Sequence, residues 1–268
     1  MTTHSPKRSL PLDYFLLVFA LAVPIWVLGG DRLPLPVKLP ASAFTTFVPA
    51  IAAGIATYRR SRWTGVKALL KRIGDFKRIR NRIWYAPALL LAPGLYGLSY
   101  VVMRSAGLPL PQPVSVPFLM APVYFVVFFI TDAGEELGWS GYATDPLANR
   151  WGVPKAGLFL GIVWALWHLV PFIQTGSPAP WILAQSIKTV AMRMLIVWLY
   201  SGSGKSVFAA TLYHTTDNVS WALFPNDSSH YNPFVTGAIT CIAAAILYLL
   251  RLPPWHSGLR NRSRSHVM

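Results

Sequence analysis

The chain has 268 residues, of which 54% are hydrophobic and only 12% are charged, and its mean hydropathy is +0.44. A charged share about half that of ordinary globular domains excludes a disordered chain and argues against a soluble globule. At roughly 20 residues per span, this length allows about eight to ten helices in lipid. We therefore expect an all-α, integral membrane protein.

The formal net charge is +15, from 24 Lys and Arg against 9 Asp and Glu. In a soluble protein this balance would favour nucleic-acid binding. Here the basic residues gather between apolar runs, which predicts contact with anionic membrane lipid and no nucleic-acid partner. The single cysteine, Cys241, excludes an intrachain disulfide and a cysteine metal cluster.

Eight apolar segments are predicted to cross the membrane, forming one transmembrane domain over residues 1–268 with an intramembrane cavity. We expect the first to be retained, because no clear signal-peptidase site follows it. The segments are about Leu12–Gly30, Ala41–Tyr58, Ile83–Met103, Pro117–Tyr142, Ala156–Ile173, Trp181–Tyr200, Ser206–Phe224 and Phe234–Leu250.

The basic residues also predict the orientation of the chain. Nineteen lie at the termini or in the loops on the same side as the termini, and three, including Arg32 and Lys38, lie in the loops on the other side. This asymmetry predicts a multi-pass protein of the plasma or inner membrane with both termini in the cytoplasm. Residues 59–82 carry ten basic residues. We expect a basic cytoplasmic loop there, and one alternative is that the loop lies on the membrane surface as an amphipathic helix.

Ionisable residues inside the apolar segments give the strongest functional signal. A charge at membrane depth costs at least ~2.5–3.5 kcal/mol on insertion scales, so each such residue is a functional hypothesis by default. They are Asp132, Glu135 and Glu136 in the fourth segment, His168 in the fifth, Lys188 and Arg193 in the sixth, and His214 and Asp217 in the seventh, which also holds the polar Asn218.

The spacing of these residues predicts that they converge. Gly161, Trp164 and His168 share one helix face, and His214 and Asn218 are one turn apart. Three helices can thus turn polar groups toward one cavity. A carboxylate with a histidine can activate water there, while an amide and a second imidazole stabilise an oxyanion, so the set suits amide hydrolysis.

Three strings in these segments resemble the motifs of the CPBP family of CAAX-processing and bacteriocin-processing intramembrane proteases. Residues 135–142, EELGWSGY, resemble its EExxxR motif, residues 164–168, WALWH, resemble FxxxH, and residues 214–218, HTTDN, resemble HxxxN. The three occur in the family's order within a motif region of about residues 117–224.

The resemblance implies an eight-helix bundle with a cavity open to the cytoplasm and the membrane. It implies a CAAX prenyl protease-like intramembrane endopeptidase of the glutamate type, without a cofactor, that acts on membrane-associated or lipidated protein tails. By this likeness Glu135 and His168 would activate water, His214 and Asn218 would form the oxyanion site, and Glu136 would support it.

One position departs from the family pattern, because Ser140 stands where the first motif has Arg. Arg193 or Lys188 is expected to supply the missing charge, or Glu136 is protonated, or the chain is a weakened or inactive homologue. Trp164 replaces the Phe of the second motif, and we expect it to pack rather than to contact substrate.

Other functions stay open at this point. Glu135, His168 and His214 could bind zinc as in a metalloprotease, although no H-E-x-x-H signature is present. A transporter, an immunity protein or a scaffold is a further hypothesis, since intramembrane acids and histidines also relay protons. The two glutamates could form a solvated helix end, and Asp217 could pair with a basic residue of the sixth segment.

Residues 202–206, GSGKS, imitate the end of a phosphate-binding loop. The full pattern requires Gly at position 199, where this chain has Leu199. We therefore expect a short cytoplasmic turn between the sixth and seventh segments.

Overall fold

The computed structural model describes residues 10–28, 41–226 and 228–250, and all regular elements in these ranges are helical. The predicted all-α class is thereby confirmed. The elements are α1 (Leu12–Leu28), η1 (Ala41–Phe47), α2 (Val48–Leu70), η2 (Lys71–Gly74), η3 (Phe76–Arg78), η4 (Arg82–Trp84), α3 (Tyr85–Ser105), η5 (Phe118–Met120), α4 (Ala121–Gly138), η6 (Trp139–Thr144), α5 (Asp145–Trp151), α6 (Val153–Gln174), α7 (Ala179–Gly202), α8 (Val207–Ala222) and α9 (Pro233–Leu249).

Each of the eight predicted segments coincides with a helix. Large apolar side chains such as Leu90 and Leu183, 67% and 63% exposed, cover the outer surface, as a lipid-facing helix bundle requires. The number of passes and the orientation stay predictions, and Arg32, Lys38 and both tails lie outside the described residues. The helical stretches long and apolar enough to cross a membrane are Arg82–Ser105, Phe118–Trp151, Val153–Gln174 and Ala179–Gly202, with Leu12–Leu28 and Pro233–Leu249 as shorter apolar helices.

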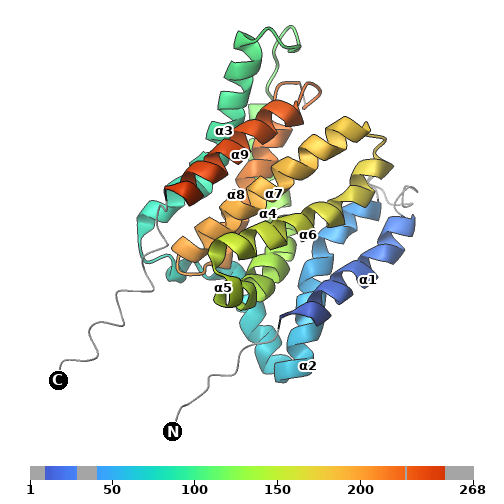
Figure 1. The fold of residues 1–268 in the computed structure, drawn as a ribbon, viewed down its shortest axis with the longest axis vertical. Helices are drawn as coiled ribbons and strands as arrows, with labels where there is room; N and C mark the ends of the chain where they lie inside the picture. Colours follow the sequence, from blue (N-terminus) through green and yellow to red (C-terminus); the bar gives the residue numbers. More distant parts are fainter. Residues whose placement is uncertain (1–9, 29–40, 227, 251–268) are drawn as a thin grey trace, which may run out of the picture.

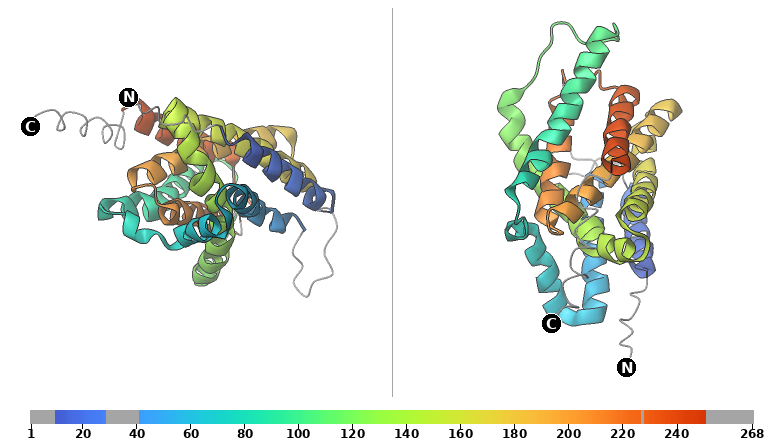
Figure 2. Two further views of the ribbon diagram at one scale, coloured as in Figure 1. Left: turned by 90° about the horizontal axis from the view of Figure 1, so that it is seen from below. Right: turned by 60° about the vertical axis from the view of Figure 1, so that its left-hand side comes forward.

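Two helical stretches extend well beyond their predicted segments. The fourth continues beyond Tyr142 through the π-helical turn η6 into α5, since Pro146 falls in the first turn of α5, where its missing N–H is tolerated. Helix α2 continues beyond Tyr58 to Leu70 across a kink at Arg62. Part of the predicted basic loop is therefore helical, and 3-10 turns follow (Figure 2, right, cyan).

The helices that carry the motifs pack against one another at close range. Helices α6, α7 and α9 run side by side (Figure 1), and α4 packs against α2 and α8. At Gly161 a Cβ would lie 2.9 Å from the carbonyl oxygen of Val190 in α7, and at Gly138 it would lie 2.5 Å from that of Pro49 in α2. Gly161 lets the backbones of α6 and α7 approach, and Gly138 does the same for α4 and α2. Helix α8 packs directly on α4, so the polar side chains of α4, α6, α7 and α8 come together.

Candidate active site

A cavity of about 230 Å³ lies between α3, α4, α6, α7 and α8, and all four predicted catalytic side chains line it. Tyr96 and Gln185 add further polar groups, and aromatic side chains supply much of the remaining wall. The lining consists of Tyr96, Glu135, Trp164, His168, Phe172, Trp181, Gln185, Lys188, Thr189, Met192, His214, Asp217, Asn218 and Trp221.

Glu135 reaches this cavity from the last turn of α4. It is 7% exposed, so the two glutamates do not form a solvated helix end. Its Oε2 accepts a hydrogen bond from the indole Nε1 of Trp164 at 2.8 Å, and no described residue bonds its other carboxylate oxygen. One lone-pair-bearing oxygen of Glu135 is thus available to a molecule in the cavity.

His168 lies one turn after Trp164 on α6. Its Nδ1 is 2.8 Å from the carbonyl oxygen of Trp164, and because a carbonyl only accepts, Nδ1 carries the proton. In the neutral ring Nε2 then keeps its lone pair. Trp164 thereby contacts both halves of the predicted water-activating pair. The sequence predicted a supporting residue there that packs and does not contact substrate, and it did not predict these two hydrogen bonds.

Glu136 points away from the cavity into a completely buried cluster. Its Oε1 and Oε2 accept hydrogen bonds from Nη1 of Arg193 at 2.8 and 2.9 Å. Oε2 also accepts a short hydrogen bond from the hydroxyl of Ser140. Both Glu136 and Arg193 have 0% exposure. Arg193 on α7 therefore supplies the charge missing at Ser140, the first of the alternatives that the sequence left open, and its guanidinium also stacks 3.9 Å above the ring of Trp164.

His214 and Asn218 on α8 both contact carboxylates of α4. The Nδ1 of His214 lies 3.0 Å from Glu136, and its Nε2 lies 3.8 Å from Asp132. Asn218 donates one amide hydrogen to Asp132 at 2.9 Å. Sequence reasoning noted Asp132 without a role; its position one turn before Glu135 on the same helix was the signal that could have placed it in the site.

Asp217 pairs with Lys188 across the same cavity, as one of the sequence alternatives foresaw. The two charges are joined by a short ion pair, and both side chains are nearly fully buried. Tyr96 also donates to the Asp217 carboxylate at 3.4 Å. This pair closes one wall of the cavity with little net charge.

The zinc alternative required Glu135, His168 and His214 to gather around one point. In the part of the chain that the structure describes, no group of three His, Cys, Asp or Glu side chains is arranged to hold a metal ion. Glu135 is instead bonded to an indole, and His214 to Glu136.

The comparisons with known proteins fall on this same region. Residues 117–220 match the family model described as "Type II CAAX prenyl endopeptidase Rce1-like". The match lies within the predicted motif region of residues 117–224 and contains all three motifs, so the resemblance to CAAX-processing proteases is confirmed.

One curated relative is the "CAAX prenyl protease 2" of Methanococcus maripaludis. It is 31% identical over an alignment of 134 residues, and this alignment covers 47% of this chain and 49% of the relative. The chain therefore aligns with about half the length of that protein.

Proposed function

We propose that this protein is an intramembrane endopeptidase that hydrolyses a peptide bond in a lipidated, membrane-associated protein tail. The observation that carries the proposal is the shared cavity, in which Glu135, His168, His214 and Asn218 all meet. The Rce1-like match over residues 117–220 and the name of the aligned relative support a prenylated substrate.

The free oxygen of Glu135 and the Nε2 of His168 are the groups that activate water. As the water oxygen bonds to the scissile carbonyl carbon, Glu135 accepts a water proton, and this proton passes to the amine nitrogen when the C–N bond breaks. Trp164 fixes the Glu135 carboxylate and accepts from His168, which pre-organises both groups for that transfer.

The oxyanion is stabilised from α8. Asn218 uses only one of its two amide hydrogens on Asp132, so the second is available to the developing oxyanion. His214 donates from Nδ1 to Glu136, so it can stabilise the oxyanion only through a proton on Nε2. The charged Glu136–Arg193 pair behind His214 fixes the orientation of the ring and supports an active enzyme despite Ser140.

The proposal is tested with purified protein in lipid nanodiscs and a farnesylated peptide. We expect cleavage by the wild type and a loss of about 10²–10⁴-fold in kcat for His168→Gln and for Glu135→Gln. His230→Gln, outside the cavity, is the matched control. Wild-type turnover by His168→Gln removes that residue from the mechanism, and no cleavage of prenylated or unmodified peptides by the wild type overturns the proposal.

The same assay separates the remaining alternatives. In our proposal the reaction needs no bound metal, so dialysis against a chelator leaves turnover unchanged. Stoichiometric zinc that is lost together with activity would establish the metalloprotease instead. Proton-coupled uptake into vesicles without any proteolysis would establish the transporter.

A further inference from the structure

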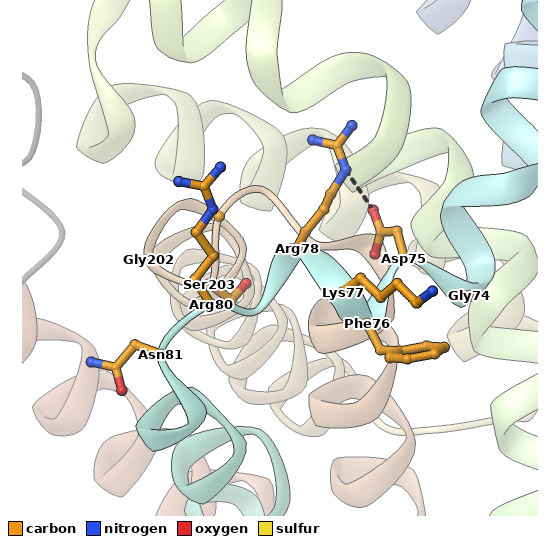
Figure 3. Close-up of a pocket in the computed structure, with 10 residues that line it drawn as sticks. Gly74, Asp75, Phe76, Lys77, Arg78, Arg80, Asn81, Gly202 and Ser203 are labelled. Atoms are coloured by element: carbon orange, nitrogen blue, oxygen red, sulfur yellow. Dashed lines mark ion pairs between the residues drawn. The ribbon is translucent and has the colours of Figure 1, made fainter.

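A second, larger hollow lies at the C-terminal end of α7, beyond the part of that helix that lines the catalytic cavity. It has a volume of about 980 Å³ and is lined by the segment after α2 and by the Gly-Ser-Gly turn after α7 (Figure 3). We call it the basic groove; its lining residues are Gly74, Asp75, Phe76, Lys77, Arg78, Arg80, Asn81, Gly202, Ser203 and Gly204.

The basic groove lies where two candidate membrane spans meet the water. Its Asn81 directly precedes the stretch Arg82–Ser105, and its Gly202 is the last residue of Ala179–Gly202. Beside it the rings of Trp84 and Trp198 pack edge to face at 4.9 Å. Tryptophan is typical of the membrane interface, so the basic groove opens at the level of lipid headgroups.

The positive charge of the basic groove is largely uncompensated. Lys77, Arg78 and Arg80 are all exposed, and within the described ranges Lys77 and Arg80 have no ion-pair partner. The one acidic lining residue, Asp75, is already engaged by Arg78 at 3.4 Å. Figure 3 shows the guanidinium groups of Arg78 and Arg80 on the same side of the chain segment.

The helix start beside the turn is closed to an external phosphate, because Asp75 already occupies it. The carboxylate of Asp75 accepts from Ser206 Oγ at 2.7 Å and from the backbone N–H of Phe208 at 3.0 Å. The GSGKS string thus binds an internal carboxylate instead of a nucleotide. A ligand anion has to bind to the arginine side chains.

The walls of the basic groove are held in place independently of any ligand. Arg72 donates to the carbonyl oxygens of Gly141 and Lys205, each at 2.6 Å, which ties the basic segment to η6 and to the turn. Gly204 has a φ of +79°, and a Cβ there would lie 2.5 Å from the carbonyl oxygen of Arg78. The turn and the basic segment are therefore in direct backbone contact.

We propose that the basic groove binds the headgroup phosphate of an anionic phospholipid between Arg78 and Arg80. Ile83, which is 66% exposed and lies two residues after the lining residue Asn81, offers apolar surface for the upper part of an acyl chain. A charged phosphate next to apolar surface at the end of two spans fits a lipid better than a soluble anion. This inference does not depend on the proposed proteolysis.

The test measures binding of short-chain phosphatidylglycerol to the full-length protein in neutral detergent by native mass spectrometry. Each basic residue near an anionic headgroup contributes on the order of a fivefold change in affinity. We therefore expect Arg80→Gln to weaken binding about fivefold and Arg78→Gln with Arg80→Gln about 25-fold. Arg104→Gln, an exposed arginine at the other end of α3, is the matched control and leaves binding unchanged.

The outcomes are distinct. Phosphatidylcholine of the same chain length, which carries no net charge, should bind at least tenfold more weakly. If Arg80→Gln binds the lipid with wild-type affinity, or if Arg104→Gln loses as much affinity as Arg80→Gln, the proposal is overturned. Displacement of the lipid by an equal concentration of inorganic phosphate would show a site for a soluble anion instead. Because Arg80 has no described partner, its variant should melt at the wild-type temperature, which separates lost binding from lost folding.

Discussion

The two neighbouring glutamates of α4 have opposite environments. Glu136 is fully buried and bonded to Arg193, Ser140 and His214, whereas Glu135 receives one hydrogen bond, from Trp164, and faces the cavity. Adjacent residues on a helix point about 100° apart, so one of them can belong to a buried ionic cluster while the next faces the cavity. The comparison shows two kinds of carboxylate. When both oxygens accept hydrogen bonds from the protein, the carboxylate stabilises the fold. When one oxygen has no protein donor, that oxygen is available to accept a proton.

The largest effect is expected when the charge of the cavity-facing Glu135 is removed without changing the shape of its side chain. Glu135→Gln keeps an oxygen for the indole of Trp164 and should retain the fold while kcat falls by about 10²–10⁴-fold, because the base is lost. Turnover is measured on the farnesylated peptide, and unfolding is followed by circular dichroism. Asp13→Asn, an exposed carboxylate paired with Arg60, is the control and should retain full activity.

A second test removes Arg193, the cation that pairs with the buried Glu136. Arg193→Met leaves Glu136 ionised without its cation, and we expect a loss of about 3–5 kcal/mol in the free energy of unfolding. Glu136→Gln in the same chain should recover most of that loss, since no buried charge then remains unpaired. If Arg193→Met and the double variant unfold at the same denaturant concentration, the ion pair is not what holds this cluster.

A third test concerns the hydrogen bond that the indole of Trp164 donates to Glu135. Trp164→Phe keeps an aromatic ring between Glu135 and His214 but removes the N–H donor, and we expect kcat to fall about tenfold with little change in KM. Trp167→Phe on the same helix, whose indole nitrogen has no hydrogen-bond partner among the described residues, is the matched control. An equal effect of both substitutions would point to packing instead of the hydrogen bond.

The smallest effect is expected at the position where the motif arginine is absent. Ser140→Ala removes one hydrogen bond to a carboxylate that keeps Arg193 and His214, so the free energy of unfolding should fall by about 1–2 kcal/mol. Chemical denaturation measures this change, and activity should remain within a few-fold of the wild type. A complete loss of turnover would instead place Ser140 in the reaction.

Much of this arrangement could be predicted from the residues alone. The apolar runs gave the helices, because 20 residues without charge have few other stable states in lipid. The helical spacing of Trp164 and His168, and of His214 and Asn218, predicted that their side chains share faces. The three motifs together predicted a region similar to CAAX-processing proteases at about residues 117–224. The Rce1-like family model then matched residues 117–220.

Partners on different helices could not be predicted from spacing. The choice of Arg193 over Lys188 as the partner of Glu136, the indole hydrogen bond to Glu135 and the contacts of Asp132 all depend on how α4, α6, α7 and α8 are rotated and placed. Periodicity along one helix determines which residues share a face. The packing of several helices decides which faces meet, and only the tertiary structure contains that information.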